Sequence, residues 1–231
     1  MYNQHLLLVR QNPIFHGLSA QLHEHILQHA HVLKVEPNGF LIRQGDPATA
    51  FYILAQGHIR LIQLTPDGSQ VLLRFLNAGQ EFGVIAVLSG LEYPISAQAI
   101  EHCEVLVWEG ELLAQLMEQH PRIGFNALRA MAVQNQELQR RYQEMLTERV
   151  EQRLAQALVR LVRQLGQATT EGTLLDCPIS REDLAEMIGT TLFTVSRILS
   201  QWEHEGVVEA KWKKVLILRQ QDLERLADPA E

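Results

Sequence analysis

Short apolar runs separated by glycines occupy the first half of the chain. Runs of Val, Ile, Leu and Phe lie between residues 32 and 107, interrupted by Gly39, Gly45, Gly57, Gly68, Gly79 and Gly83. This pattern predicts many short antiparallel strands. Pro66-Asp67-Gly68 separates "IRLIQL" from "VLLRFL", and because proline presets one φ and glycine accepts a positive φ, we expect a hairpin there. Strands at this spacing close into a sandwich or jelly roll, whose interior can hold a small molecule.

A helical period replaces the strand pattern after Glu109. The segment "GELLAQLMEQH" fits a short helix, and Pro121 suits the first turn of the next one. Spacings of three and four residues then define a heptad seam, made of Leu128, Met131, Asn135, Leu138, Tyr142 and Met145. The lone polar Asn135 takes an a position, where such a residue commonly sets register and strand number, so we expect a parallel homodimer. The alternative is that the seam packs on the chain's own β-domain.

The helical pattern is interrupted near Thr147 and restarts from Val150 to Leu165, with Gly166 as a terminator and "QATTEGT" as a loop. These breaks predict three parts. Residues 1–118 form a β-roll sensor domain, residues 119–148 form a dimerisation helix, and residues 149–231 form a third domain.

Residues 179–199 of that third domain have the pattern of two short helices joined by a tight turn. Ser180 can cap the first helix, Gly189 suits the positive φ of the turn, and Thr190 or Thr191 can cap the second helix. The apolar residues that would pack the helices together are Leu184, Ala185, Ile188, Val195, Ile198 and Leu199. The spacing predicts a helix-turn-helix. An ordinary helical hairpin is the alternative, and the "TTLFTVSR" face favours DNA binding.

A basic turn follows the two helices. "GVVEA" and "VLILR" flank Lys211-Trp212-Lys213-Lys214, which predicts a strand, a turn and a return strand, as in a wing. Lysines beside an aromatic ring can approach a phosphate backbone, and Arg181 and Arg197 would lie on the same side if the second helix enters the major groove. The alternative for this turn is a solvated loop tip.

Composition and charge exclude several classes of protein. The chain has 231 residues, 46% hydrophobic and 20% charged, which is typical of a packed fold. Phe82–Leu91, the longest apolar stretch, has about half the roughly 20 residues of a membrane helix, so we expect no membrane partner. The first residues, Met1–Gln11, lack the pattern of an export signal, so we expect a cytoplasmic protein. The net charge is −7, yet residues 179–219 hold six basic and six acidic side chains, so a local DNA-binding face is compatible with it.

Three segments together resemble the CRP/FNR superfamily of bacterial transcription factors. They are "FLIRQGDPATAFYILAQGHIRL" with "TPDGSQ", "EQRLAQAL", and "ISREDLAEMIGTTLFTVSRIL", and the resemblance extends from about Phe15 to Leu218. It implies an α+β fold with an N-terminal antiparallel β-roll of the cyclic-nucleotide-binding type, a long dimerisation helix and a C-terminal winged helix-turn-helix. It also implies a homodimer that binds a pseudo-palindromic operator in double-stranded DNA and contacts RNA polymerase.

The same resemblance assigns residues to DNA. Arg197 fits bidentate contact with a guanine edge, and Ser196 can reach a base or a phosphate. The other residues expected at the interface are Ser180, Arg181, Thr190, Thr191, Leu192, Phe193, Lys211, Lys213 and Lys214. The family usually has glutamate at the position of Phe193, and glutamate accepts from a cytosine amine whereas phenylalanine can pack on a thymine methyl. The familiar operator of the family is therefore not assumed.

The sensor part departs from the cyclic-nucleotide pattern. Members that bind cyclic nucleotides have a glutamate after the glycine of "GEL" and an arginine before a serine, whereas here Gly83 precedes Val84-Ile85, and Ile95 precedes Ser96. Losing the arginine removes charge-assisted hydrogen bonds worth about 1.5 to 3 kcal/mol each, which argues against cyclic AMP. We expect instead an apolar effector pocket formed by Gly83, Val84, Ile85, Ala86, Ile95 and Ser96.

Other cofactors follow from cysteine and histidine usage. Cys103 and Cys177 cannot ligate an iron–sulfur cluster by themselves, and we expect both to be buried reduced thiols. Ten histidines keep haem as an alternative, because the roll also resembles the branch of the family that senses nitric oxide. His25 and His29 lie four residues apart, but "HEHILQHAH" is typical of a solvated helix face, and no metal site is predicted.

The sequence leaves three hypotheses for the function of the protein. The first is a dimeric DNA-binding regulator with a sensing roll. The second is a partner-binding regulatory module whose roll senses haem or another ligand and whose helix-turn-helix serves only for packing. The third is an enzyme, which the absence of a Ser/His/Asp order, a phosphate loop or an "HExxH" motif argues against.

Overall fold

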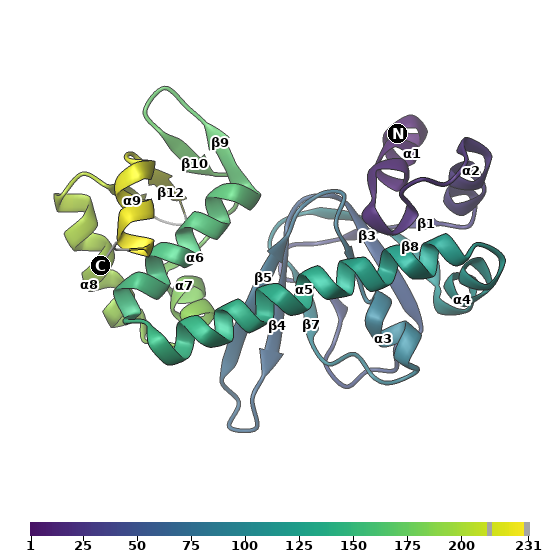
Figure 1. Cartoon of the computed structure of the whole chain (residues 1–231), viewed down its shortest axis with the longest axis horizontal. Helices are drawn as coiled ribbons and strands as arrows, with labels where there is room; N and C mark the ends of the chain where they lie inside the picture. The colour runs from purple at the N-terminus through teal and green to yellow at the C-terminus, as the bar shows by residue number, and fades with distance from the viewer. Residues whose placement is uncertain (212–213, 229–231) are drawn as a thin grey trace. The chain divides into compact units, whose positions relative to one another are not determined.

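The computed structural model describes residues 1–211 and 214–228. The chain divides into two compact units. The first comprises Met1–Ser69 with Leu73–Glu137, and the second comprises Gln70–Leu72 with Leu138–Glu231. The predicted α+β class is confirmed, with strands in both units and a long helix, α5, that contributes to each of them (Figure 1).

The first unit is built around two four-stranded sheets, with strand orders β1-β8-β3-β6 and β2-β7-β4-β5. The strands are β1 His31–Val35, β2 Phe40–Ile42, β3 Ala50–Gln56, β4 Ile59–Leu64, β5 Gln70–Leu76, β6 Glu81–Phe82, β7 Ser96–Ala99 and β8 Cys103–Glu109. The pairs β1–β8, β3–β8 and β4–β7 are antiparallel, as the short glycine-bounded runs predicted. The predicted turn joins β4 to β5, where Gly68 has a φ of 84° and Thr65 N donates to Ser69 O at 3.0 Å.

Two apolar clusters form the core of this unit. One lies where the helices α1 Tyr2–Gln11, α2 Ala20–Gln28 and α4 Gly110–Gln119 meet the sheet, and it centres on Phe15, Phe51 and Trp108. The rings of Phe51 and Trp108 stack at 5.1 Å, and the indole N–H of Trp108 donates to Ile26 O at 2.7 Å, so its polar group is satisfied in the core. The other cluster joins residues of both sheets, among them Leu54 and Leu61.

Helix α5, Pro121–Thr147, begins at the predicted proline. Its first turns bury Ile123 and Ala127 against the first unit. The side chain of Asn126 donates to Ile14 O at 3.0 Å and to His16 O at 2.9 Å, which anchors the helix to the N-terminal segment. The heptad residues, from Leu128 to Met145, lie on the exposed side of this helix.

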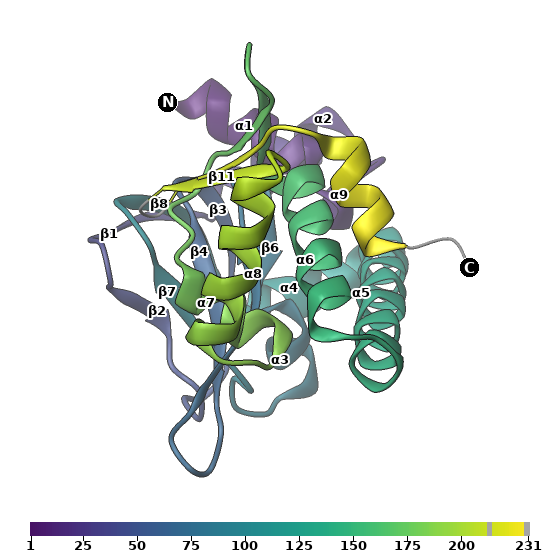
Figure 2. The same ribbon diagram turned by 90° about the vertical axis from the view of Figure 1, so that its left-hand side faces the viewer.

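The second unit combines helices with a small sheet. Its elements after α5 are α6 Val150–Leu165, β9 Gly166–Ala168, β10 Thr173–Leu175, α7 Arg181–Ile188, α8 Leu192–His204, β11 Val208–Lys211, β12 Lys214–Ile217 and α9 Gln220–Ala227. The strand order is β11-β12-β10-β9. Figure 2 shows α8 beside α7, with β11 next to it.

One sequence prediction in this unit was wrong. The segment "QATTEGT", expected to be a loop, includes the end of β9 and the start of β10, which form a hairpin closed by Thr169 N donating to Gly172 O at 2.7 Å. Its strands are three residues long and β9 is fully exposed, so they have no alternation of apolar and polar positions to reveal them. Pairing of β10 with β12 supplies the backbone partners instead.

Candidate nucleic-acid interface and sensor region

The first helix of the predicted helix-turn-helix is capped at both ends. Ser180 Oγ accepts from Asp183 N at 3.0 Å, and Asp183 Oδ2 accepts from Ser180 N at 2.8 Å, which forms a reciprocal capping box. At the other end Gly189 has a φ of 64°, a conformation that glycine adopts without strain. The turn geometry expected from the sequence is confirmed.

The second helix, α8, starts immediately after this turn. Thr191 is its cap rather than Thr190, because Thr191 Oγ1 accepts from Thr194 N at 3.2 Å. Its buried side is formed by Val195, Ile198, Leu199 and Trp202. These residues fix the direction of α8, so its opposite side is presented to solvent.

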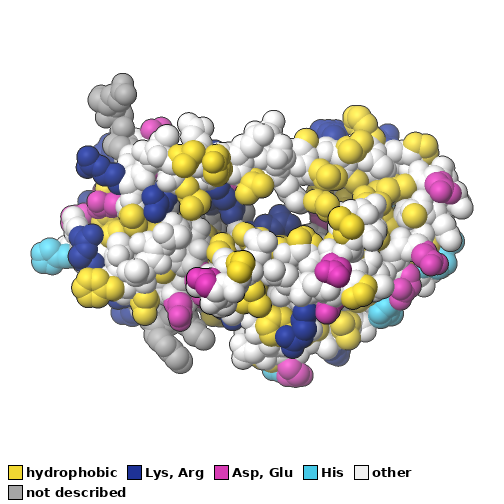
Figure 3. Space-filling view, turned by 90° about the horizontal axis from the view of Figure 1, so that it is seen from below, with side chains coloured by type: hydrophobic (Ala, Val, Ile, Leu, Met, Phe, Trp, Pro, Cys, Tyr) yellow, Lys and Arg dark blue, Asp and Glu magenta, His cyan; other side chains and the backbone are white. Residues whose placement is uncertain are grey.

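That opposite side carries the residues expected to read DNA. Leu192 is 49% exposed and Phe193 is 79% exposed, Arg197 is exposed, and Ser196 is half-buried. Arg197 makes no hydrogen bond or ion pair with any residue that the structure describes. In Figure 3 Lys and Arg side chains lie among exposed apolar side chains over the C-terminal unit, at the left of the view.

Arg181 is attached to the wing strands. Its guanidinium donates to Ala210 O at 3.4 Å and lies 3.5 Å from Glu203 Oε2, while Glu203 Oε1 accepts from Ala210 N at 2.9 Å. Sequence analysis missed Glu203 because it lies on the far end of α8, 22 residues from Arg181.

The wing itself is confirmed as paired strands. Lys211 of β11 faces Lys214 of β12 across the sheet, and both are exposed. The Lys211 ammonium contacts Glu209, which raises the pKa of the lysine. Trp212 and Lys213, which the sequence assigned to the turn, lie outside the described residues.

A pocket of 480 Å³ opens between the start of α7, the start of α8 and the wing. Its lining includes Ser180, Arg181, Leu192, Lys211 and Lys214. Five of the residues predicted to approach DNA therefore border one hollow.

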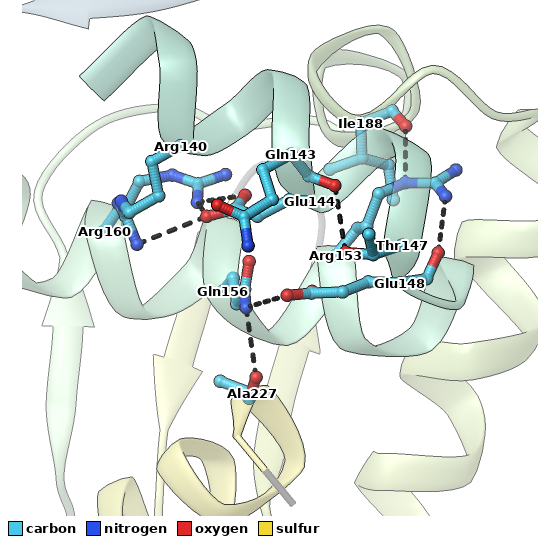
Figure 4. Close-up of polar contacts among 10 residues, drawn as sticks. All are labelled: Arg140, Gln143, Glu144, Thr147, Glu148, Arg153, Gln156, Arg160, Ile188 and Ala227. Atoms are coloured by element: carbon cyan, nitrogen blue, oxygen red, sulfur yellow. Dashed lines mark hydrogen bonds and ion pairs between the residues drawn. The ribbon is translucent and has the colours of Figure 1, made fainter. Parts of the chain in front are cut away.

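A buried ion pair joins the end of α5 to α6 (Figure 4). Arg160 Nη1 donates to both carboxylate oxygens of Glu144, at 3.0 Å and 2.7 Å, and Arg140 adds a contact to Glu144 at 3.2 Å. Glu144 is 5% exposed and Arg160 is 9% exposed. Burial lowers the pKa of the Arg160 guanidinium and the charge of Glu144 opposes that effect, so the pair is needed to keep both charges in the interior.

A second set of hydrogen bonds surrounds the joint at residues 148 and 149. Arg153 donates to Glu148 O at 2.9 Å and to Ile188 O, the end of α7, at 3.3 Å. Gln156 Nε2 donates to Glu148 Oε1 at 2.9 Å and to Ala227 O at 3.2 Å. Sequence analysis missed this network, because its partners meet only when α6 folds back on α5.

The heptad residues of α5 point away from the core of their own chain. Leu128 is 64% exposed, Leu138 63%, and Tyr142 65%, and Met131, Asn135 and Met145 are also exposed. Leu128, Met131 and Asn135, which lie in the same unit as the roll, are therefore not packed on it. Phe125 and Leu146, which the heptad pattern did not include, are exposed on the same helix.

The six residues expected to form an effector pocket are spread over the roll. Helix α3, Val84–Ser89, starts at Gly83 with a φ of 83°. Val84 belongs to the core cluster of Trp108, Ala86 belongs to the cluster between the sheets, and Ile85 is exposed. Ile95 packs on the cluster between the sheets, and the buried Ser96 accepts a hydrogen bond from Gln44 N at 2.9 Å. Their grouping into one pocket stays a prediction.

A pocket of 830 Å³ opens in this region, and its lining comes from the segments 44–48 and 90–94 and from Gln63. Tyr93 and Pro94 line it, whereas the neighbouring Ile95, one of the six predicted residues, is not part of its lining.

Both cysteines are buried, and several histidines contact other residues. Neither cysteine forms a disulfide, and burial raises the pKa of the Cys103 thiol. His58 contacts Glu101 at 2.6 Å, and the rings of His25 and His29 lie 4.5 Å apart. Within the described part of the chain, no group of three or more His, Cys, Asp or Glu residues could hold a metal ion. None of the described helices has the length and apolarity to cross a bilayer.

Both parts of this architecture match known protein domains. Residues 32–120 match the cyclic nucleotide-binding domain model, and residues 152–226 match the Crp-like helix-turn-helix domain model. The cyclic AMP receptor protein of Thermus thermophilus is 30% identical over 201 residues, which cover 87% of this chain and 89% of that protein. The chain belongs to the CRP/FNR family of transcription regulators. Its members are DNA-binding regulators rather than enzymes.

Further relatives agree with this membership. The anaerobic regulatory protein of Bacillus subtilis is 25% identical over 89% of this chain and 87% of its own length. The structure of FixK2 from Bradyrhizobium japonicum has a TM-score of 0.77 at 23% identity, covering 87% of this chain and 99% of that chain, which supports the same fold.

The ion pair at the end of α5 generates a prediction about stability. Glu144→Ala removes the carboxylate that compensates the buried Arg160 guanidinium, and we expect the free energy of unfolding to fall by about 3 kcal/mol. Urea unfolding of the full chain measures this loss. Gln143→Ala, an exposed neighbour on the same helix, is the control and should change stability by less than about 0.5 kcal/mol.

The double variant Glu144→Leu/Arg160→Met should recover most of the lost stability, because it replaces both charges by apolar groups. Equal unfolding curves for Glu144→Ala and the Gln143→Ala control would contradict the role given to the pair.

Proposed function

We propose that this family member is a homodimer that binds a pseudo-palindromic operator and whose β-roll senses an effector other than cyclic AMP. The observation that carries the proposal is the solvent-facing side of α8. Arg197, which has no described partner in its own chain, and the exposed Phe193 lie on this side of the helix. A helix-turn-helix used only for packing would cover these side chains, so this geometry disfavours the partner-binding alternative.

The DNA contacts proposed fall into two classes. Arg197, Ser196, Phe193 and Leu192 would face base edges, because they lie on the open side of the second helix. Ser180, Arg181, Thr190, Thr191, Lys211, Lys213 and Lys214 would contact phosphates or position the backbone. Arg181 already donates to Ala210 O, so its proposed role includes fixing the wing beside α8.

The proposed dimer uses the exposed seam of α5. An α-helix that exposes Leu128, Leu138 and Tyr142 to more than 60% presents apolar area that a second copy would cover. The lone Asn135 in this seam would fix the register of a parallel pair. A parallel pair brings two copies of α8 to successive half-sites about 34 Å apart.

The proposal excludes cyclic AMP as the effector but names no other compound. Ile95 offers no charge to a phosphate, which argues against cyclic AMP in the manner of relatives named as cyclic AMP receptors. A protein of similar fold, the global regulator CLP of Xanthomonas campestris, responds to c-di-GMP, so effectors differ among proteins of this fold. By family resemblance we further propose that the protein contacts RNA polymerase and acts in the cytoplasm. In this proposal residues 1–118 form the sensor domain, residues 119–148 the dimerisation helix, and residues 149–231 the DNA-binding domain.

A contrast between Arg197→Ala and Lys214→Gln tests the DNA proposal. Arg197→Ala should weaken the free energy of binding to an operator enriched from randomised duplexes by about 1 to 3 kcal/mol, and it should relax the preference at one base pair of each half-site. Lys214→Gln should weaken binding to all duplexes alike and make the slope of log affinity against log salt shallower by about one unit for each wing. Gel retardation across a salt series measures both.

The control for this contrast is Gln201→Ala, an exposed position near the C-terminal end of α8. Unchanged affinity and preference in Arg197→Ala would overturn the assignment of α8 as the reading helix.

The seam generates a separate prediction. Leu138→Asp places two like charges at the proposed interface, so we expect dimerisation to weaken more than tenfold and operator binding to weaken with it. Sedimentation velocity and gel retardation measure the two effects. Gln136→Asp adds the same charge on an exposed position outside the seam and should leave the dimer intact. An intact dimer in Leu138→Asp would refute the seam.

A further inference from the structure

Two adjacent apolar side chains stand exposed at the start of α8. Leu192 and Phe193 occupy its first turn, and among the large apolar residues that the structure describes only Met1 is more exposed than Phe193. Removing a side chain as large as phenylalanine from water is favourable, because the gain in free energy grows with the apolar area that is buried. Contact with an apolar group of a partner is therefore the interaction that this tip can contribute.

Helix geometry places the tip within the proposed reading surface. At about 100° per residue, the open side of α8 spans an arc of about 140°. It contains Leu192, Ser196, Ser200, Phe193 and Arg197. The two serines are small, so they leave room for the helix to approach a groove closely. Phe193 and Arg197 lie four residues apart, about 6 Å along the axis, which corresponds to about two base-pair rises.

The chemistry of the major groove limits what such a tip can recognise. Its edges are mostly hydrogen-bond donors and acceptors, and the C5-methyl group of thymine is their largest apolar feature. Leucine and phenylalanine side chains neither donate nor accept, so pressing them on a polar base edge would strip its water without replacing the hydrogen bond. A pyrimidine C5-methyl group is the one feature that both side chains can bury without that cost.

We propose that Leu192 and Phe193 read pyrimidine C5-methyl groups, so that each half-site requires thymine near the guanine contacted by Arg197. This rests on the proposed DNA-binding function. Two residues in succession would then select methyl groups, and the flanking Lys211 and Lys214 supply the charge that holds the helix in the groove. The methyl group of 5-methylcytosine has the same chemistry and would satisfy the same contact.

The experiment begins with enrichment of duplexes from a randomised, unmethylated pool by the full chain. Each thymine of the enriched half-site is then replaced by deoxyuridine, which removes one methyl group and leaves every hydrogen-bonding atom in place. We expect one or two thymines in each half-site to lose about three- to fivefold in affinity, the effect of one buried methyl group. Thymines outside the half-sites should lose nothing.

Protein variants connect the loss to the tip. Phe193→Ala should bind thymine and deoxyuridine equally at the affected position, whereas the control Gln201→Ala should keep the full discrimination. Phe193→Glu should change the preference at that position from T·A toward C·G, because a carboxylate accepts from the cytosine amine.

The source of the methyl group is tested separately. Replacing the affected T·A pair by 5-methylcytosine·G should bind at least threefold better than cytosine·G, which shows recognition of the methyl group itself.

Equal binding of thymine and deoxyuridine at every position of an enriched operator would overturn the methyl inference, while DNA binding itself would stand. Failure to enrich any sequence would overturn the proposed function instead. The deoxyuridine comparison changes only the DNA, so its outcome does not depend on how a protein variant folds.

Discussion

The buried ion pair between Glu144 and Arg160 is the interaction on which the arrangement of the helix-turn-helix unit depends. It holds the last turns of α5 to α6 because Nη1 of Arg160 donates to both carboxylate oxygens of Glu144, in a place where either charge alone would be costly. Arg153 and Gln156 extend this attachment to the end of α7 and to α9. The helix-turn-helix is thus tied to the end of the same helix that carries the exposed seam, so the proposed dimer contact and the proposed DNA contact both involve α5.

The sequence predicted the parts of the protein in which local rules act alone. The helix starts at Pro121 and Ser180, the positive φ of Gly68 and Gly189, and the break before Val150 follow from the preferences of single residues. Long-range partners were missed for the same reason. Glu203 with Arg181 and Glu144 with Arg160 are residues whose types are common on helix surfaces, and only the tertiary fold brings them together.

The sensor region departs from the family pattern, and its effector site stays a prediction. Replacing the expected arginine by Ile95 removes a charge, but the six residues grouped by analogy lie in different packing environments: Val84 and Ala86 belong to separate clusters, and Ile85 faces solvent. Helix α8 shows the opposite case. Phe193 departs from the family pattern, and its exposed side chain on the open face of α8 is the observation from which the thymine contact is proposed.

Hydroxyl-radical footprinting of the full chain on its enriched operator tests most directly whether two copies of α8 read one duplex together. We expect two protected segments on the same face of the DNA, centred about 34 Å apart along the axis. A single protected segment, or protection with no fixed spacing, would contradict the paired arrangement.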